Sequence, residues 1–128
     1  MNLLLDTCTF LWLCADPSKL SNTARELIVD PDNEVYLSPV SSWEIAVKYG
    51  LGRLPLPKLP SRYVPDARRR HGIEVLPLDE EAALSVDRLP GIHRDPFDRM
   101  LICQALVHGC VLLTPDDKIE GYPVRTAW

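Results

Sequence analysis

Residues 2–6 read NLLLD, so that three consecutive leucines end on the carboxylate of Asp6. A short, uncharged apolar run is typical of a strand that is buried on both faces of a sheet. The next apolar segment, TFLWLCA at residues 9–15, has a length that favours a helix. In parallel α/β sheets, ligands bind beyond the carboxyl ends of the strands, where the following helices begin. Asp6 is therefore expected at the edge of the sheet where a functional site would lie.

Strands and helices alternate along the rest of the chain. A helix of about two turns is predicted after a cap near Ser21, and the proline-rich segment 54–60 is predicted to be an extended loop. Further strands are predicted at 34–39, 73–78, 110–114 and 122–127, and further helices at 41–52, 61–72, 79–89 and 96–109. This alternation predicts an α/β, three-layer domain with a mostly parallel central sheet.

Composition limits what the protein does. With 128 residues and 46% hydrophobic content, the chain is expected to form one domain over residues 1–128. No apolar stretch approaches the ~20 residues of a membrane span and no signal sequence is evident, so we expect no membrane association and a cytoplasmic location. The net charge of −4 argues against a broadly basic surface for nucleic acid. The four cysteines lack CxxC spacing and are interpreted as reduced core residues.

Four carboxylates occupy equivalent places in the predicted fold. Asp6 and Asp116 follow apolar strands, whereas Glu44 and Asp98 lie near the starts of predicted helices. Because these positions meet at one edge of a parallel sheet, the four acids are expected to converge there. Oxygen ligands without His or Cys select hard ions such as Mg²⁺ or Mn²⁺, which assist phosphodiester hydrolysis in many enzymes.

Helix capping is the alternative interpretation of each acid. Ser41 and Glu44 have the spacing of a capping box, and Asp95 before Pro96 is a favourable N-cap. Asp6 and Asp116 also precede segments that they could cap. Taken singly, each acid is better explained by capping than by catalysis.

Helical spacing argues for more than capping at two of the acids. Asp98 and Glu44 each share a helical column with apolar residues, which predicts that both point toward the core. The columns contain Ile102 and Leu106 for Asp98, and Val47 and Leu51 for Glu44. Several acids on a partly buried edge would repel one another, so a cation is expected among them.

The order of the four motifs resembles that of PIN-domain ribonucleases, in particular the VapC toxins of bacterial toxin–antitoxin pairs. The motifs are LLLDT, SSWEIAVK, RDPFDRMLICQA and LLTPDD, and they extend from the first strand to the last. The resemblance implies a five-stranded parallel sheet flanked by helices, RNA cleavage that depends on Mg²⁺ or Mn²⁺, homodimerisation, and a small VapB-type antitoxin as partner.

Carried over by position, the resemblance makes Asp6, Glu44, Asp98 and Asp116 the catalytic and metal-binding quartet. Asp6 and Asp98 are expected as principal ligands of one Mg²⁺, with the other two acids completing the site directly or through water. Whether a second ion arrives with RNA is left open. Two further residues are expected in supporting roles, Thr114 as a hydroxyl beside the last acid and Asp95 mainly as a helix cap.

Basic and aromatic residues near the motifs have two interpretations each. His93, Arg94 and Arg99 could hold the RNA backbone, or the two arginines could balance the acids. The basic segment 68–71 is interpreted first as a solvated helix face. Three aromatic residues are interpreted as core or dimer-interface residues, namely Trp12, Trp43 and Tyr49.

Three alternative functions remain at this stage. A phosphatase of the haloacid-dehalogenase type also begins with a strand and an Asp, but it requires a second Asp where this chain has Cys8. The other two are a housekeeping PIN nuclease without an antitoxin, and an inactive PIN-like module that only binds a partner. The intact set of four acids argues against the inactive module.

Overall fold

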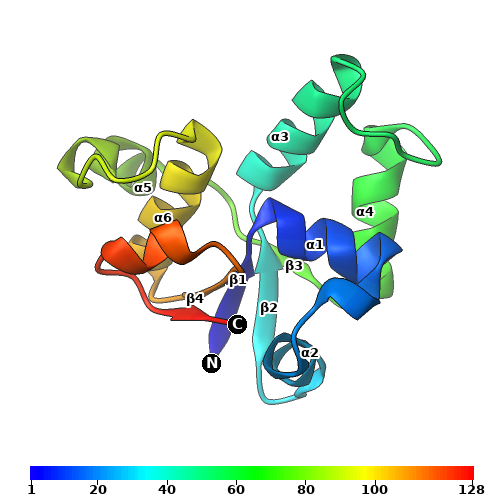
Figure 1. Cartoon of the computed structure of the whole chain (residues 1–128), viewed down its shortest axis with the longest axis horizontal. Helices are drawn as coiled ribbons and strands as arrows, with labels where there is room; N and C mark the ends of the chain where they lie inside the picture. The colour runs from blue at the N-terminus through cyan, green and yellow to red at the C-terminus, as the bar shows by residue number, and fades with distance from the viewer.

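The computed structural model describes residues 1–128 and contains a five-stranded sheet with helices on both faces (Figure 1). The strand order is β3-β2-β1-β4-β5 and every neighbouring pair is parallel. The strands are β1 (Asn2–Leu5), β2 (Glu34–Leu37), β3 (Glu74–Val75), β4 (Val111–Leu113) and β5 (Thr126–Ala127). The predicted three-layer α/β architecture is therefore confirmed.

Six α-helices and three 3₁₀ helices connect the strands. The α-helices are α1 (Thr7–Ala15), α2 (Asn22–Val29), α3 (Pro39–Gly50), α4 (Pro60–Arg70), α5 (Glu80–Leu84) and α6 (Pro96–His108). The 3₁₀ helices are η1 (Pro17–Lys19), η2 (Ser85–Arg88) and η3 (Asp117–Gly121). Helices α1, α2 and α4 cover one face of the sheet, and α5 and α6 cover the other (Figure 1).

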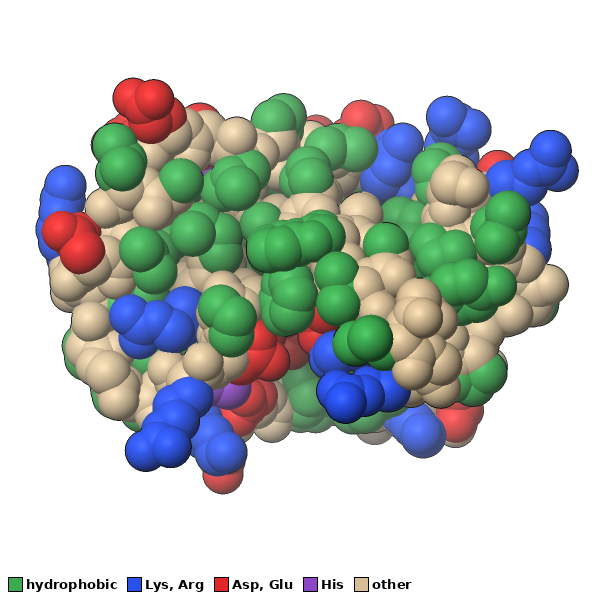
Figure 2. Space-filling view, turned by 90° about the horizontal axis from the view of Figure 1, so that it is seen from above, with side chains coloured by type: hydrophobic (Ala, Val, Ile, Leu, Met, Phe, Trp, Pro, Cys, Tyr) green, Lys and Arg blue, Asp and Glu red, His purple; other side chains and the backbone are tan.

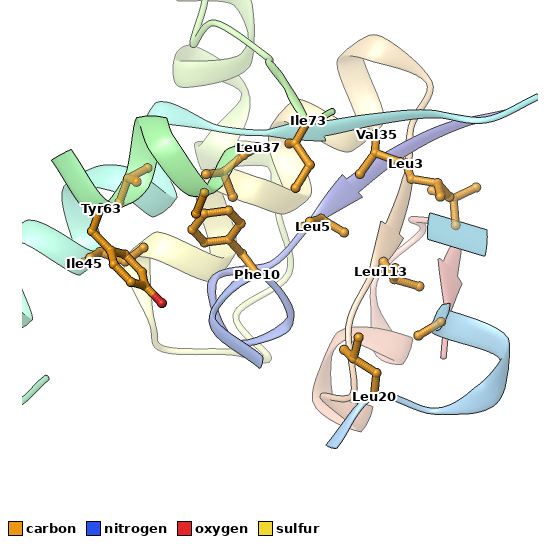
Figure 3. Packing of buried hydrophobic residues seen from close by; sticks show 14 residues of the cluster. Leu3, Leu5, Phe10, Leu20, Val35, Leu37, Ile45, Tyr63, Ile73 and Leu113 are labelled. Carbon is orange, nitrogen blue, oxygen red and sulfur yellow. The ribbon is translucent and has the colours of Figure 1, made fainter. Parts of the chain in front are cut away.

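The leucine run forms the central strand and supplies both cores. Leu3, Leu4 and Leu5 are fully buried, as expected for a strand that pairs with β2 on one side and β4 on the other. Leu3 and Leu5 point into the cluster under α1, α2 and α4, where Leu5 lies near Phe10 (Figure 3). Leu4 points to the opposite face and packs in the cluster formed with α6. Asp6 is thereby held at the end of a strand that has little freedom to move.

Some predicted boundaries are wrong. Helix α3 begins at Pro39, and its N-cap is Ser38, whose hydroxyl accepts a hydrogen bond from the Val40 N–H. The capping box at Ser41 and Glu44 does not exist, because Pro39 fixes the first helical position two residues earlier.

The outer strands and one helix are shorter than predicted. Strands β3 and β5 have only two residues each, because each pairs with a neighbour on one side only. The helix predicted over 79–89 divides into α5 and η2. The chain has no helix with the length and hydropathy that a membrane span requires. All four cysteines are free thiols; Cys103 and Cys110 are buried as predicted, while Cys8 and Cys14 are only partly buried.

Candidate metal centre

The four predicted acids line one pocket of about 300 Å³. It lies where β1 and β4 end and where α1 and α6 begin. Figure 2 shows acidic side chains gathered in a hollow of this face, with basic side chains on both sides. The complete lining is Asp6, Thr7, Cys8, Glu44, Lys48, Asp95, Asp98, Pro115 and Asp116. The expectation that the acids converge at one sheet edge is confirmed.

Asp6 is both a helix cap and the most rigidly held acid. Its Oδ1 accepts a hydrogen bond of 2.8 Å from the Thr9 N–H, which makes Asp6 the N-cap of α1. Its Oδ2 accepts a 2.6 Å hydrogen bond from the Thr114 hydroxyl. Burial raises the pKa of Asp6, although the hydrogen bonds from Thr114 and Thr9 act in the opposite direction.

Thr114 connects two of the acids. Its hydroxyl donates to Asp6 and accepts a 3.1 Å hydrogen bond from the Asp116 N–H. Asp116 in turn caps η3, since its Oδ1 accepts a hydrogen bond from the Lys118 N–H. Burial tends to raise the pKa of Asp116, but the hydrogen bonds from the Lys118 N–H and from the His93 ring outweigh it and lower the pKa.

Glu44 is buried for a different reason from the predicted one. Val47 and Leu51, in its helical column, are 37% and 62% exposed, so that column does not face the core. The side chain of Glu44 is nevertheless buried, because it packs against the start of α1 and its Oε1 accepts a 2.7 Å hydrogen bond from the Thr7 hydroxyl. Its other oxygen, Oε2, forms an ion pair with Lys48 one turn further along α3.

Asp98 is the acid that the first turn of α6 contributes to the pocket. It lies in the first turn of α6, after the N-cap Asp95, whose Oδ1 accepts hydrogen bonds from the Phe97 and Asp98 N–H groups. Burial, with the nearby charges of Asp95 and Asp6, raises the pKa of Asp98 to about 7. The helical column of Asp98 faces the core only in part, because Ile102 is buried whereas Leu106, further along the column, is 40% exposed.

His93 lies between two of the acids. Its Nε2 is 2.9 Å from Asp116 Oδ2 and 3.3 Å from Asp98 Oδ2. Its Nδ1 accepts a 3.1 Å hydrogen bond from the Asp95 N–H, an assignment that leaves the ring proton on Nε2. His93, Asp98 and Asp116 bring ligand atoms within 4.8 Å of one another, but this tautomer makes the histidine a donor to the acids and not a metal ligand.

The two neighbouring arginines behave differently from each other. Arg99 donates to the backbone carbonyls of Pro90, His93 and Val86 and to the Tyr122 hydroxyl, so it supports the loop before α6. The interpretation of Arg99 as a counter-ion of the acids is wrong, because it forms no ion pair with them. Arg94 is exposed and has no ion pair or side-chain hydrogen bond, and its contact with RNA stays a prediction.

The donor set of the pocket fits a hard divalent ion. Carboxylate oxygens are the ligands that Mg²⁺ and Mn²⁺ prefer. The thiol of Cys8 also lines the pocket, but burial and the charge of Asp6 raise its pKa to about 11, so it stays protonated and does not supply a thiolate. Burial is the main cause that raises the pKa values of Asp6 and Asp98, so their ionised forms are unfavourable in this pocket when no metal is bound.

The fold and this pocket together define a parallel α/β domain with an acidic centre at the carboxyl edge of its sheet. A family model described as "PIN domain" matches residues 3–124, and the chain therefore belongs to the PIN-domain family.

Relatives in sequence and structure agree with this assignment. Ribonuclease VapC16 of Mycobacterium tuberculosis is 45% identical over 58 residues, which are 45% of this chain; the match spans 41% of that relative. The structure of VapBC2 from Rickettsia felis, bound to a DNA fragment from its promoter, matches with a TM-score of 0.75 and 13% identity, covering 99% of this chain and 98% of that one. VapBC-1 from Haemophilus influenzae matches with a TM-score of 0.66 and 17% identity, covering 99% and 97%. At these identities, the two structures show the shared fold.

Proposed function

We propose that the protein is an endoribonuclease that depends on Mg²⁺ or Mn²⁺, with residues 1–128 as one PIN domain and with a role as the toxin of a VapBC-type pair. The observation that carries this proposal is the convergence of Asp6, Glu44, Asp98 and Asp116 in one pocket whose charge is not balanced by the protein. Such a cluster is unfavourable for folding, which argues that it is retained for binding a cation.

Asp6 and Asp98 are the proposed principal ligands, because their pKa values are the ones raised by burial. Glu44 and Asp116 complete the site directly or through water. A bound ion would activate a water and offset charge on the scissile phosphate. The family resemblance implies products with a 5′-phosphate and a 3′-hydroxyl.

Other residues of the chain position these acids. Thr114 holds Asp6 and orients Asp116, and Asp95 fixes the first turn of α6. His93 keeps Asp98 and Asp116 together through one ring proton. Arg94, exposed next to His93, is the proposed contact to the RNA backbone.

The proposed partners follow from the relatives. The structural neighbours from R. felis and H. influenzae are VapBC complexes, which supports a VapB-type antitoxin for this chain. A cytoplasmic location stays a prediction. A homodimer is proposed from the family resemblance. Trp43 is compatible with an interface, because it is 62% exposed and packs edge-on against Phe97.

Metal-dependent RNA cleavage tests the proposed activity. Purified protein freed of antitoxin should cleave single-stranded RNA in Mg²⁺ or Mn²⁺ and lose activity in EDTA, and Asp6→Asn or Asp98→Asn should abolish cleavage. Asp32→Asn is the matched control, because Asp32 is exposed in a turn and only its backbone N–H forms a hydrogen bond, to the Asp30 side chain. Full activity in chelator would refute the metal-dependent mechanism.

The antitoxin is tested separately. A basic residue of its tail is expected to reach the four acids, since an Arg fork matches a pair of carboxylates. The apparent affinity of a synthetic tail should then fall as the Mg²⁺ concentration rises. An affinity that responds neither to Mg²⁺ nor to Arg→Ala in the tail would mean that inhibition blocks RNA at a distance from the acids.

A further inference from the structure

Lys48 is the only lysine or arginine that forms an ion pair with an acid of the pocket. It lies one turn after Glu44 on α3, and its side chain is 46% exposed whereas that of Glu44 is 7% exposed. The ammonium group therefore reaches down from the rim of the pocket to a buried carboxylate. The ammonium group donates a hydrogen bond to Glu44 Oε2, so the two side chains form an ion pair at the edge of the pocket.

Both oxygens of Glu44 already have partners. Oε1 accepts a hydrogen bond from the Thr7 hydroxyl, and Oε2 is paired with Lys48. Thr7 is buried at the start of α1 and offers a neutral hydroxyl, whereas Lys48 is a cation with a flexible stem and a solvent-exposed path. A divalent ion bound to Glu44 would repel the ammonium group of Lys48 but not the hydroxyl of Thr7, so Lys48 is the partner that we expect to leave Oε2.

Lys48 lies at the boundary between two hollows of the surface. It lines the acid pocket and also the adjoining groove of about 280 Å³, whose wall includes Trp12, Arg53 and Leu54. Because α3 fixes the Lys48 backbone at the boundary of these two hollows, its ammonium group would stay at the mouth of the acid pocket. A polyanion that reaches the acids through the groove would pass this position, and an ammonium group is a strong point charge for phosphate.

We propose that Lys48 is an internal counter-ion of Glu44 that competes with the divalent ion and, once displaced, binds a phosphate of the RNA next to the scissile bond. This inference rests on the proposed nuclease function. Lys48 then has two successive partners, the Glu44 carboxylate before metal binding and an RNA phosphate afterwards. Its ammonium group, once displaced from Glu44, offsets charge on the substrate.

The alternative is that the ion pair only supports α3. An ion pair at this spacing can stabilise a helix, and such a role alone would affect neither metal nor RNA binding. Lys48→Met removes the charge and keeps most of the stem, while Lys48→Arg keeps the charge. Lys58→Met is the matched control, because Lys58 pairs with Asp66 away from the acid pocket.

Two binding measurements on the full chain distinguish these possibilities. In calorimetric titration of the metal-free protein, Lys48→Met should bind Mn²⁺ about 2–5-fold more tightly than wild type, because the competing ion pair is absent. RNA binding is measured in Ca²⁺, with a gel to check that the RNA stays intact. The same variant should bind a short single-stranded RNA several-fold more weakly. The slope of log K against log salt concentration should also be smaller by about one, as expected for the loss of one phosphate contact. Lys48→Arg and Lys58→Met should retain RNA binding close to wild type.

Each outcome has one meaning. Unchanged or weaker Mn²⁺ binding by Lys48→Met overturns the competition, and unchanged RNA binding overturns the phosphate contact. If wild type itself neither binds Mn²⁺ nor cleaves RNA, the proposed nuclease function fails instead. The two failures are therefore separable, because the metal titration does not depend on turnover.

Discussion

Asp98→Asn should make the metal-free protein more stable at neutral pH. Relative to its ordinary value of 3.8, the pKa of Asp98 is raised to about 7 by burial and by the charges of Asp95 and Asp6. An acid with a raised folded-state pKa contributes fully to stability below its unfolded pKa, and this contribution is lost as pH rises through the folded pKa. Wild type in EDTA should therefore lose more stability than the Asn variant between about pH 4 and pH 7, while Asp6, whose pKa is also raised, contributes to the pH dependence of both proteins.

The size of the effect follows from the shift. A difference of about three pKa units at about 1.36 kcal/mol each gives an upper limit of about 4 kcal/mol. The side chain is 20% exposed, and water screening reduces this to about 2 kcal/mol. Asn cannot replace the favourable interaction of a carboxylate with the start of α6, which is worth about 0.3–1 kcal/mol. The expected net gain is about 1–2 kcal/mol at pH 8 and close to zero at pH 4.

Urea unfolding in EDTA, followed by tryptophan fluorescence at pH 4, 6 and 8, measures this difference. Asp32→Asn makes the same chemical change at an exposed turn and should alter stability little at each pH. A loss of stability in Asp98→Asn that is equal at all three pH values would show that Asp98 is chiefly a structural residue. The reasoning from charge repulsion would then be wrong.

Three further outcomes are expected. Mn²⁺ at millimolar concentration should raise the melting temperature of wild type but not of Asp6→Asn, as thermal unfolding would show, since only a protein that binds the ion is stabilised by it. Thr114→Val should cost about 1–2 kcal/mol and also weaken Mn²⁺ binding in calorimetry, because its hydroxyl donates to Asp6 Oδ2. Arg99→Met should lower the urea midpoint, while Arg94→Met should leave the midpoint unchanged and weaken RNA binding in a gel-shift assay.

The positions of the acids could be predicted because they obey a local rule. An apolar run that is buried on both faces must be an interior strand, and a residue directly after it must lie at the sheet edge. This reasoning placed Asp6 and Asp116 correctly from a few residues each. The burial of Glu44 was predicted from an apolar helical column, and the prediction is right for the wrong reason. Glu44 is buried, but Val47 and Leu51 in its column are exposed. Its burial depends on Thr7, which lies 37 residues away in the sequence.

Element ends were harder to predict than element positions. The outer strands β3 and β5 are short because each has a single pairing neighbour, and the sequence does not indicate which strand is outermost. At α3, a Ser-x-x-Glu pattern competed with a Ser-Pro pattern, and the fixed φ of Pro39 selected Ser38 as the cap. When one segment contains two possible N-cap patterns, the pattern with proline at the first helical position is the better guide to where the helix begins.

The contact of His93 with the acids could not be predicted from spacing, because it depends on loop conformation. His93 reaches Asp98 and Asp116 only because the loop before α6 is held by Arg99 and by the Tyr122 hydroxyl, which accepts a hydrogen bond from the His93 N–H. The acids themselves are fixed by strand ends and helix starts, whereas the groups that neutralise them come from a loop and from a flexible lysine stem. A site that exchanges protein donors for a metal ion requires fixed acids and movable counter-ions, because rigid counter-ions would compete too strongly with the ion. The acids can therefore be identified in the sequence and His93 only in the structure, whereas the spacing of Glu44 and Lys48 on one helix is a signal for their ion pair that the sequence does contain.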